Sequence, residues 1–190
     1  MPDATAPRDL RSDALRNQQE LVRAATTAFH RDGLRVPMAT IAAEAGVGVG
    51  TLYRHFPTRE DLLNHLTHRS FEQVLANAQT AERDGATAAE ALRLFIDAAI
   101  RQRNDLVLPL HGGPPVTAAE TAVLRDRIHA IVQRIIDGGI AEGTLRPGVI
   151  PRDIVVFGSM LAQPQQADPD WDARCRRLLD TYLRGIRRHP

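Results

Sequence analysis

The sequence predicts an all-α protein of roughly eight or nine helices. Apolar residues recur at helical spacing in several long segments, and no segment shows the period-two alternation of a half-buried strand. The chain has 190 residues, of which 43% are hydrophobic and 25% are charged. These proportions are typical of a globular protein, and a chain of this length can bury a sizeable core.

The amino-terminal elements are expected to be an arm followed by a long helix. Residues 1–11 are polar and contain two prolines, which indicates a flexible arm. The first helix is expected from about Ser12, a plausible N-cap, to about Arg31, and Gly33 ends it. Its apolar face consists of Leu21, Val22, Ala25, Ala28 and Phe29.

Two short helices joined by a glycine turn are expected between Thr40 and Phe56. The Thr40 side chain is a candidate cap of the first of them, Gly46 breaks it, and the second runs from about Val49 to His55. This pattern is typical of a helix-turn-helix, whose second helix is presented to the major groove of DNA. The apolar positions of the two helices are Ile41, Ala42, Ala45, Val47, Leu52 and Phe56.

Two threonines indicate where the next helices begin. Thr58, with Asp61 three residues later, resembles a capping box that opens a long helix. Thr87 is a candidate N-cap of the following helix, which is expected to run to about Arg103. Prolines and glycines over residues 104–116 predict a loop with one short helical turn.

The last three helices are read from apolar periodicity and proline positions. An amphipathic helix is expected to start at Thr117, Pro151 fits the first turn of the next helix, and the last helix begins near Asp170. Cys175 is expected to pack on the apolar face of that last helix. Because it is the single cysteine, a disulfide within the chain and a cysteine-based zinc finger are both excluded.

Charge and hydropathy limit the classes of partner. The net charge is +1, so a nucleic-acid role requires a local basic surface. Residues 8–59 hold eight arginines and five acidic residues, and all 24 basic residues of the chain are Arg, although a GC-rich coding sequence explains that bias equally well. No apolar run approaches the ~20 residues that span a bilayer, and no signal-peptide pattern is present, so a cytoplasmic location is expected.

The run from Met38 to Leu63 reads M-A-T-I-A-A-E-A-G-V-G-V-G-T-L-Y-R-H-F-P-T-R-E-D-L-L. It resembles the DNA-binding segment of the TetR family of transcriptional regulators. The preceding amphipathic helix and the long following helix match the same pattern, and the close match covers about residues 12–66.

The resemblance implies a two-domain subunit. A helix-turn-helix DNA-binding domain would cover residues 12–57, and an effector-binding and dimerisation domain would cover residues 58–190. It implies a homodimer that binds a palindromic operator in double-stranded DNA, responds to a small-molecule effector and acts as a repressor. It implies no enzymatic activity, no cofactor and no membrane partner.

The residues proposed to contact DNA combine family positions with donor chemistry. Arg54 suits guanine or phosphate, while Tyr53 and His55 match family positions that commonly contact the DNA backbone. Gly48 stands where the family often has Ser or Thr, and Arg59 where it usually has Lys. The full set is Thr40, Gly48, Val49, Gly50, Thr51, Tyr53, Arg54, His55 and Arg59.

The residues proposed to line an effector pocket are less specific, because each is more often a core or interface residue. Arg103 and His111 flank the Pro/Gly loop, which is a candidate pocket lid. The set is Leu66, Phe95, Arg103, His111, His129, Met160 and Trp171, with Phe71, Ile96, Leu110 and Phe157 beside them. The helical spacing of His65, His68 and Glu72 suits a metal, but a polar helix face explains it better, and no metal is expected.

Two other classes of function remain as alternatives. A helical enzyme is one, although the chain has no G-x-S-x-G, H-E-x-x-H or Walker motif. A non-regulatory helix-turn-helix DNA-binding protein is the other, and it would not need a further bundle of about 120 residues. Preference for one site by about 10³-fold over random DNA would favour a regulator over either alternative.

Overall fold

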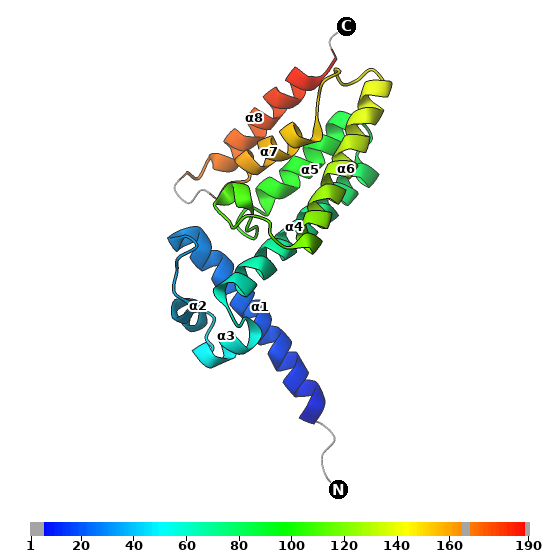
Figure 1. Cartoon of the computed structure of the whole chain (residues 1–190). Helices are drawn as coiled ribbons and strands as arrows, with labels where there is room; N and C mark the ends of the chain where they lie inside the picture. Colours follow the sequence, from blue (N-terminus) through cyan, green and yellow to red (C-terminus); the bar gives the residue numbers. More distant parts are fainter. Residues whose placement is uncertain (1–5, 165–167, 189–190) are drawn as a thin grey trace. The chain divides into compact units, whose positions relative to one another are not determined.

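The computed structural model describes residues 6–164 and 168–188, with side chains from residue 17 onward. Within these residues the chain forms eight α-helices and one short 3-10 turn (Figure 1). The only β-type pairing described there is an isolated antiparallel bridge between Leu145 and Arg187. The all-α prediction is therefore confirmed. No helix of the described part is long and apolar enough to cross a bilayer.

The order of elements follows the sequence pattern closely. The elements are α1 (Ala6–Asp32), α2 (Met38–Glu44), α3 (Val49–His55), α4 (Arg59–Asp84), α5 (Ala88–Arg101), η1 (Pro109–His111), α6 (Ala119–Ala141), α7 (Pro151–Leu161) and α8 (Trp171–Ile186). They fall into two compact units, Met1–Leu66 and Thr67–Pro190, with the boundary inside α4.

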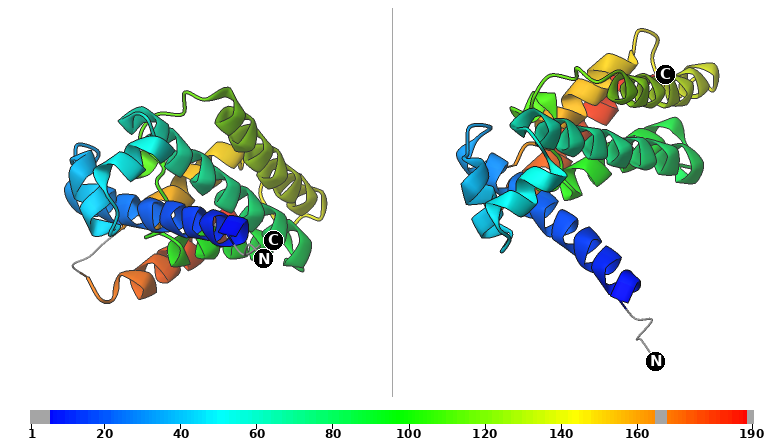
Figure 2. Two further views of the ribbon diagram at one scale, coloured as in Figure 1. Left: turned by 90° about the horizontal axis from the view of Figure 1, so that it is seen from below. Right: turned by 60° about the horizontal axis from the view of Figure 1, so that its bottom comes forward.

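In the first unit, α2 packs against both α1 and α3 (Figure 2). Gly46 adopts φ +68° in the turn between α2 and α3, a left-handed conformation that other residues rarely adopt. Leu52 of α3 is fully buried and anchors that helix to the core. The buried residues of this unit include Leu21, Val22, Ala25, Phe29, Ile41, Ala42, Leu52, Phe56 and Leu62.

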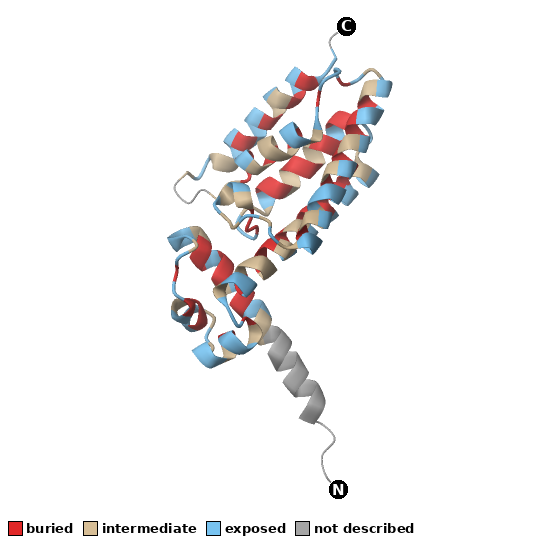
Figure 3. Ribbon diagram, in the orientation of Figure 1, coloured by how far each residue is buried: buried red, intermediate tan, exposed pale blue. Residues whose placement is uncertain are grey.

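In the second unit, α5 is the central helix and packs against α6, α7 and α8. Its buried positions extend over most of its length (Figure 3). Cys175 of α8 is fully buried and its Sγ donates to the Leu161 carbonyl at 3.3 Å, so its predicted core position is confirmed. The core also includes Leu92, Phe95, Ile96, Ile100, Ile128, Val132, Ile136, Ile154, Leu179 and Leu183.

Two predicted helix caps are confirmed. The Thr58 amide donates to Asp61 Oδ2 at 2.9 Å, and the Asp61 amide donates to Thr58 Oγ1 at 3.0 Å, which is a reciprocal capping box. Thr87 accepts from the Glu90 amide at 3.2 Å, and the Glu90 carboxylate accepts from the Ala86 amide at 3.1 Å. The expected short turn in the Pro/Gly loop is η1.

Two expected helix starts and one expected helix cap were wrong. The chain is helical from Ala6 rather than from about Ser12, so only residues 1–5 of the expected arm lie outside the described residues. A proline at residue 7 is tolerated there because first-turn amides have no helical partner. The N-cap of α2 is Pro37, so Thr40 is the third residue of the helix and does not cap it. The N-cap of α6 is Ala118 rather than Thr117, with no side-chain cap.

Candidate functional site

Helix α3 presents a short outward face of mixed apolar and donor groups. Its N-cap, Gly48, makes no side-chain cap bond. Leu52 is the one buried residue of this helix, while Tyr53 is 47% exposed and Val49 is 39% exposed. Large side chains this exposed on a short helix, whose opposite side is anchored in a core, leave a surface free for a partner.

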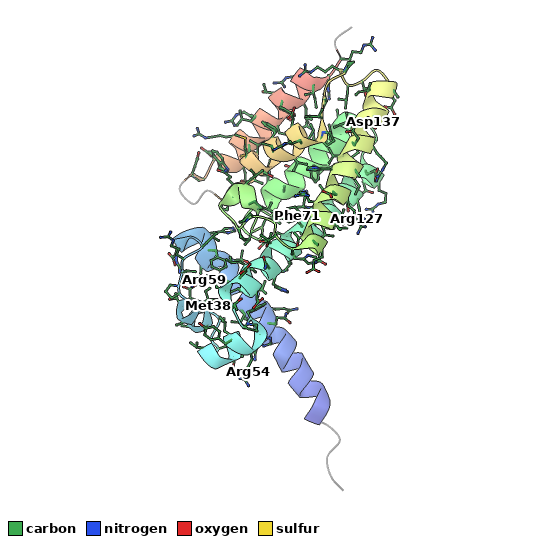
Figure 4. The ribbon with its side chains drawn as sticks, in the orientation of Figure 1. Met38, Arg54, Arg59, Phe71, Arg127 and Asp137 are labelled. Carbon is green, nitrogen blue, oxygen red and sulfur yellow. The ribbon has the colours of Figure 1, made fainter. Side chains whose placement is uncertain are left out.

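Arg54 lies along the surface of its own helix. Its Nε donates to the Gly50 carbonyl at 3.3 Å and its Nη2 donates to Thr51 Oγ1 at 2.9 Å. Figure 4 shows this side chain on the exposed side of α3. Three of the residues proposed for DNA contact are therefore joined in one surface cluster.

Arg59 has a contact that the sequence did not indicate. Its Nη1 donates to the carbonyl of Leu34 at 3.0 Å and to that of Val36 at 2.5 Å. The guanidinium therefore ties the first turn of α4 to the connection between α1 and α2. Its proposed contact with phosphate stays a prediction, and the structure gives Arg59 a packing role in addition.

The remaining DNA candidates flank this surface. Thr40 is half-buried on α2, and Gly48 and Gly50 are exposed with open space where a Cβ would stand. The half-exposed His55 ring lies 6.4 Å from the Phe56 ring at a 44° tilt.

The second unit contains a cavity of about 660 Å³. It is bounded by α4, α5, α6, α7 and the segment around η1. Its described lining consists of Phe71, Val74, Phe95, Ile96, Ala99, Leu108, Pro109, Leu110, Pro115, Val116, Arg125, Ile128, His129, Arg152, Val155, Val156, Gly158, Ser159 and Ala162. A cavity of this size and mainly apolar lining is typical of small-molecule sites, which measure about 300–1,000 Å³.

The cavity includes only part of the predicted ligand set. Phe95 and His129 line it, as do the neighbouring candidates Phe71, Ile96 and Leu110. Leu66 is instead buried at the end of the first unit. Met160 lines a separate hollow of about 290 Å³ beside α7 and α8.

Three other ligand candidates stabilise the second unit around the cavity rather than line it. Arg103 Nη1 pairs with Asp172 Oδ1 at 2.5 Å and so links the segment after α5 to the first turn of α8. His111 Nε2 lies 2.8 Å from the Ser159 carbonyl, a hydrogen bond that joins η1 to α7. Trp171 is half-buried against the core.

Sequence reasoning missed the two arginines of the lining, Arg125 and Arg152. Arg125 lies four residues before His129 and therefore on the same face of α6, which is the one signal that the sequence offered. The pKa of His129 is lowered, first by burial and then by the positive charge of Arg125; Asp126 opposes the shift, and Arg152 adds a smaller lowering effect. The cavity edge carries two arginines and no lining carboxylate, and the lowered pKa of His129 favours its neutral form near pH 7.

A second surface feature lies on α7 and α8. The rings of Phe157 and Tyr182 stack with centroids 4.0 Å apart and an interplanar angle of 14°. Met160, one turn after Phe157, is 58% exposed, and Leu178, one turn before Tyr182, is 51% exposed. We name these four residues the α7–α8 patch.

The metal spacing noted on α4 has ordinary polar partners. His68 Nδ1 lies 3.0 Å from Thr121 Oγ1, and its Nε2 lies 3.7 Å from Glu72 Oε1. The described residues contain no cluster of three or more metal-binding side chains.

Comparison with known proteins assigns the first unit to a family. Residues 21–66 match the family model for bacterial regulatory proteins of the tetR family. An HTH-type transcriptional regulator of Staphylococcus aureus, SAB2452, is 29% identical over 103 residues, covering 54% of this chain and 56% of the relative. The chain thus matches only about half the length of such curated relatives.

Solved structures with a similar fold cover most of the chain. A TetR transcription regulatory protein from Mycobacterium vanbaalenii is 26% identical with a TM-score of 0.63, covering 94% of this chain and 99% of that one. The regulator FadR from Bacillus subtilis, crystallised with stearoyl-CoA, is 21% identical with a TM-score of 0.69, covering 89% and 99% of the two chains. At that identity the second likeness concerns the fold alone.

The matched residues 21–66 run from the buried face of α1, through α2 and α3, to the first turns of α4, and they include the exposed surface of α3. Residues 21–66 therefore form a DNA-binding domain of the TetR family of transcriptional regulators, in a chain whose fold matches that of solved TetR-family regulators.

Proposed function

We propose that the protein is a repressor that binds a palindromic operator as a homodimer and releases it when a small molecule occupies the cavity. The DNA-binding part of this proposal rests on the outward face of α3. That helix reads V-G-T-L-Y-R-H, with no carboxylate to repel phosphates. A short helix with one buried anchor and exposed donors has the form of a recognition helix in the major groove.

The local charge pattern supports the same proposal. Glu44, at the end of α2, accepts from Arg31 Nη2 at 2.6 Å, and Asp32 pairs with the same guanidinium at 2.5 Å. Two of the carboxylates near the helix-turn-helix are therefore neutralised within the first unit. This reduces the electrostatic cost of bringing the unit to the phosphate backbone.

We propose distinct roles for the exposed residues of α3. Arg54 would leave its contacts with Gly50 and Thr51 to reach a guanine or a phosphate, for which a guanidinium fork is well suited. Val49 and the methyl group of Thr51 would contact thymine methyls. Tyr53 and His55 would donate to backbone phosphates, which positions the helix without reading sequence.

We assign dimerisation to the α7–α8 patch. Phe157 of α7 stacks on Tyr182 of α8, and one turn away on the same two helices Met160 and Leu178 are exposed. Residues of this type are enriched at protein interfaces. A pair of such faces related by two-fold symmetry would be self-complementary.

We assign effector binding to the cavity of about 660 Å³. The structural neighbour FadR from B. subtilis was crystallised with stearoyl-CoA, so at least one protein of similar fold binds a small molecule. Effector binding would favour a state of the dimer that fits the operator less well. The coupling between two sites of this kind is typically ~1–3 kcal/mol.

The test is selection of DNA sequences by the full chain from a random duplex library, followed by titration of the selected site. We expect a palindromic site that is preferred over random DNA by about 10³-fold or more at physiological salt. Arg54→Ala should reduce this preference. Arg83→Ala is the matched control, because Arg83 is an exposed arginine paired with Asp84 at the far end of α4. Recovery of no preferred site would contradict the proposal.

A further inference from the structure

The cavity of the second unit has one edge that differs chemically from the rest. Most of the wall is apolar, with Phe71 and Phe95 on one side and Val155 on another. Figure 4 labels Phe71 on α4. At the differing edge, Arg125 and His129 come from α6 and Arg152 comes from α7. None of the described lining residues is acidic.

The two arginines are incompletely neutralised. Arg125 pairs with its sequence neighbour Asp126 at 3.1 Å, in a contact where both side chains are well exposed. Pairs of that kind contribute only about 0–1 kcal/mol, so Arg125 can exchange its partner at little cost. Arg152 is an exposed residue at the cavity edge, and it makes no ion pair or hydrogen bond with any described residue.

Both guanidinium groups act on the same point of the cavity. Each lowers the pKa of His129, which lines the cavity with them. Since α6 and α7 pack against each other, an anion placed beside His129 would lie within the field of both arginines.

We propose that the effector is a small organic carboxylate with an apolar body. The apolar body fills the cavity against Phe71, Phe95 and Val155, and the carboxylate sits at the edge between Arg125 and Arg152. A guanidinium fork binds a carboxylate through two parallel hydrogen bonds, which fixes both position and orientation. This inference rests on the proposed role of the cavity as the effector site.

The same features disfavour other ligand classes. A cation would be repelled by two arginines with no lining carboxylate to offset them. An inorganic anion would leave the apolar wall uncovered, and a purely apolar ligand would gain nothing from the basic edge. Neutral His129 adds a hydrogen-bond donor or acceptor beside the carboxylate.

The test uses two probes of equal length, decanoate and its uncharged analogue decanamide. Each is titrated calorimetrically into the full chain without DNA, so the result does not depend on operator binding. We expect one decanoate per chain, bound about tenfold or more tightly than decanamide. In Arg125→Gln, Arg152→Gln and the double variant this preference should fall towards unity, while decanamide binding stays within about twofold.

Arg127→Gln is the matched control, because Arg127 is an exposed arginine on α6 that does not line the cavity (Figure 4). Thermal unfolding of each variant, followed by circular dichroism, verifies that it is folded. A variant that does not fold is replaced by Arg125→Lys or Arg152→Lys, which keeps the charge but loses the fork. Such a variant should retain part of the preference.

Three results would overturn the proposal: equal affinity for the two probes, binding of neither, or an equal loss of preference in Arg127→Gln. Operator binding by the ligand-free protein is measured separately. If operator binding persists while the carboxylate preference is absent, the ligand class is wrong and the DNA-binding function stands. If carboxylate binding is present but no operator is found, the proposed function fails instead.

Discussion

At the scale of single residues, Arg54 near the end of α3 and Arg59 at the start of α4 make different kinds of contact. Arg54 donates to groups of its own helix on an exposed surface. Arg59 donates to two backbone carbonyls of the α1–α2 connection and is partly buried. Both were proposed as DNA contacts from sequence, and the structure provides a way to separate a reading role from a packing role.

We expect Arg59→Ala to lower the free energy of unfolding by about 1–2 kcal/mol, because two carbonyls lose a charged donor. Arg54→Ala should change it by no more than about 0.5 kcal/mol, as is usual for exposed positions. Urea denaturation monitored by circular dichroism measures both values. Equal stability losses would contradict the packing role assigned to Arg59.

The same two arginines should also differ in DNA binding, where Arg54 is expected to matter more than Arg59 for the preference between sites. Arg54→Ala should reduce the preference for the selected site over random DNA, whereas Arg59→Lys, which keeps the charge, should leave that preference intact. If Arg59 also contacts phosphate, Arg59→Ala should flatten the dependence of affinity on salt concentration. An unchanged salt slope would leave Arg59 with its packing role alone.

His129 gives a pH prediction. Its pKa is lowered in the folded state by burial and by the charges of Arg125 and Arg152. As pH falls, the unfolded chain therefore takes up this proton first, near the ordinary His value of about 6.5, and the folded chain takes it up only at lower pH. Well above a pH of about 6.5 the histidine is neutral in both states and does not change the free energy of unfolding. As pH falls from about 6.5 towards the folded pKa, the protein loses stability.

We expect the drop in melting temperature between pH 7.5 and pH 5.5 to be smaller in His129→Gln than in the unmodified chain. Arg152→Gln should change the drop in the same direction but by less, because burial is the larger cause of the shift. Thermal unfolding at the two pH values measures both effects. A drop that is unchanged in His129→Gln would show that this histidine does not contribute to the acid sensitivity.

At the scale of elements, two adjacent glycines of α6 have opposite surroundings. A Cβ at Gly139 would stand 2.6 Å from Ala88 Cβ and 2.7 Å from Leu145 Cδ1, so Gly139 allows α6 to approach the start of α5 closely. A Cβ at Gly138 would meet nothing within 4 Å, and this residue is exposed. The helix therefore needs one of the two glycines and is weakened by the other.

We expect Gly138→Ala to raise the free energy of unfolding by about 0.5–1 kcal/mol, since alanine has the higher helix propensity. Gly139→Ala should lower it by about 1–3 kcal/mol through overpacking. Each variant adds one methyl group to the chain, at adjacent positions of α6, so each serves as the control for the other. Chemical denaturation of the pair decides the matter, and a stabilised Gly139→Ala variant would contradict the close packing.

The elements also show which features a sequence can predict. The caps at Thr58 and Thr87 were predicted correctly because each depends on a side chain and an amide three residues away. Residue type alone is a weaker guide: Thr40 is a plausible cap and Thr117 a plausible start, but the N-caps of α2 and α6 are Pro37 and Ala118. The cavity was harder, because Arg152 joins His129 only through the packing of α7 on α6, which no local pattern encodes.

At the scale of the whole molecule, the proposed function requires two copies. A recognition helix as short as α3 contacts one half-site, and a palindromic operator is read by two such helices about one helical turn, ~34 Å, apart. Selectivity for the full site therefore depends on the interface between copies as well as on the α3 surface. The α7–α8 patch is our candidate for that interface.

We expect Leu178→Arg to convert the dimer to a monomer, because a charge would be buried without a partner within the interface that the patch is proposed to form. The variant should lose the preference for the palindrome over a single half-site while keeping weak binding to each half, since α3 lies in the other compact unit. Val123→Arg is the matched control: Val123 is 55% exposed, on α6 and outside the patch. Sedimentation velocity measures the assembly state and operator titration measures the preference. If Leu178→Arg remains dimeric, or if Val123→Arg dissociates equally, the interface must lie elsewhere. If Leu178→Arg is monomeric and still prefers the palindrome, then the operator is not read by two recognition helices held together in a dimer.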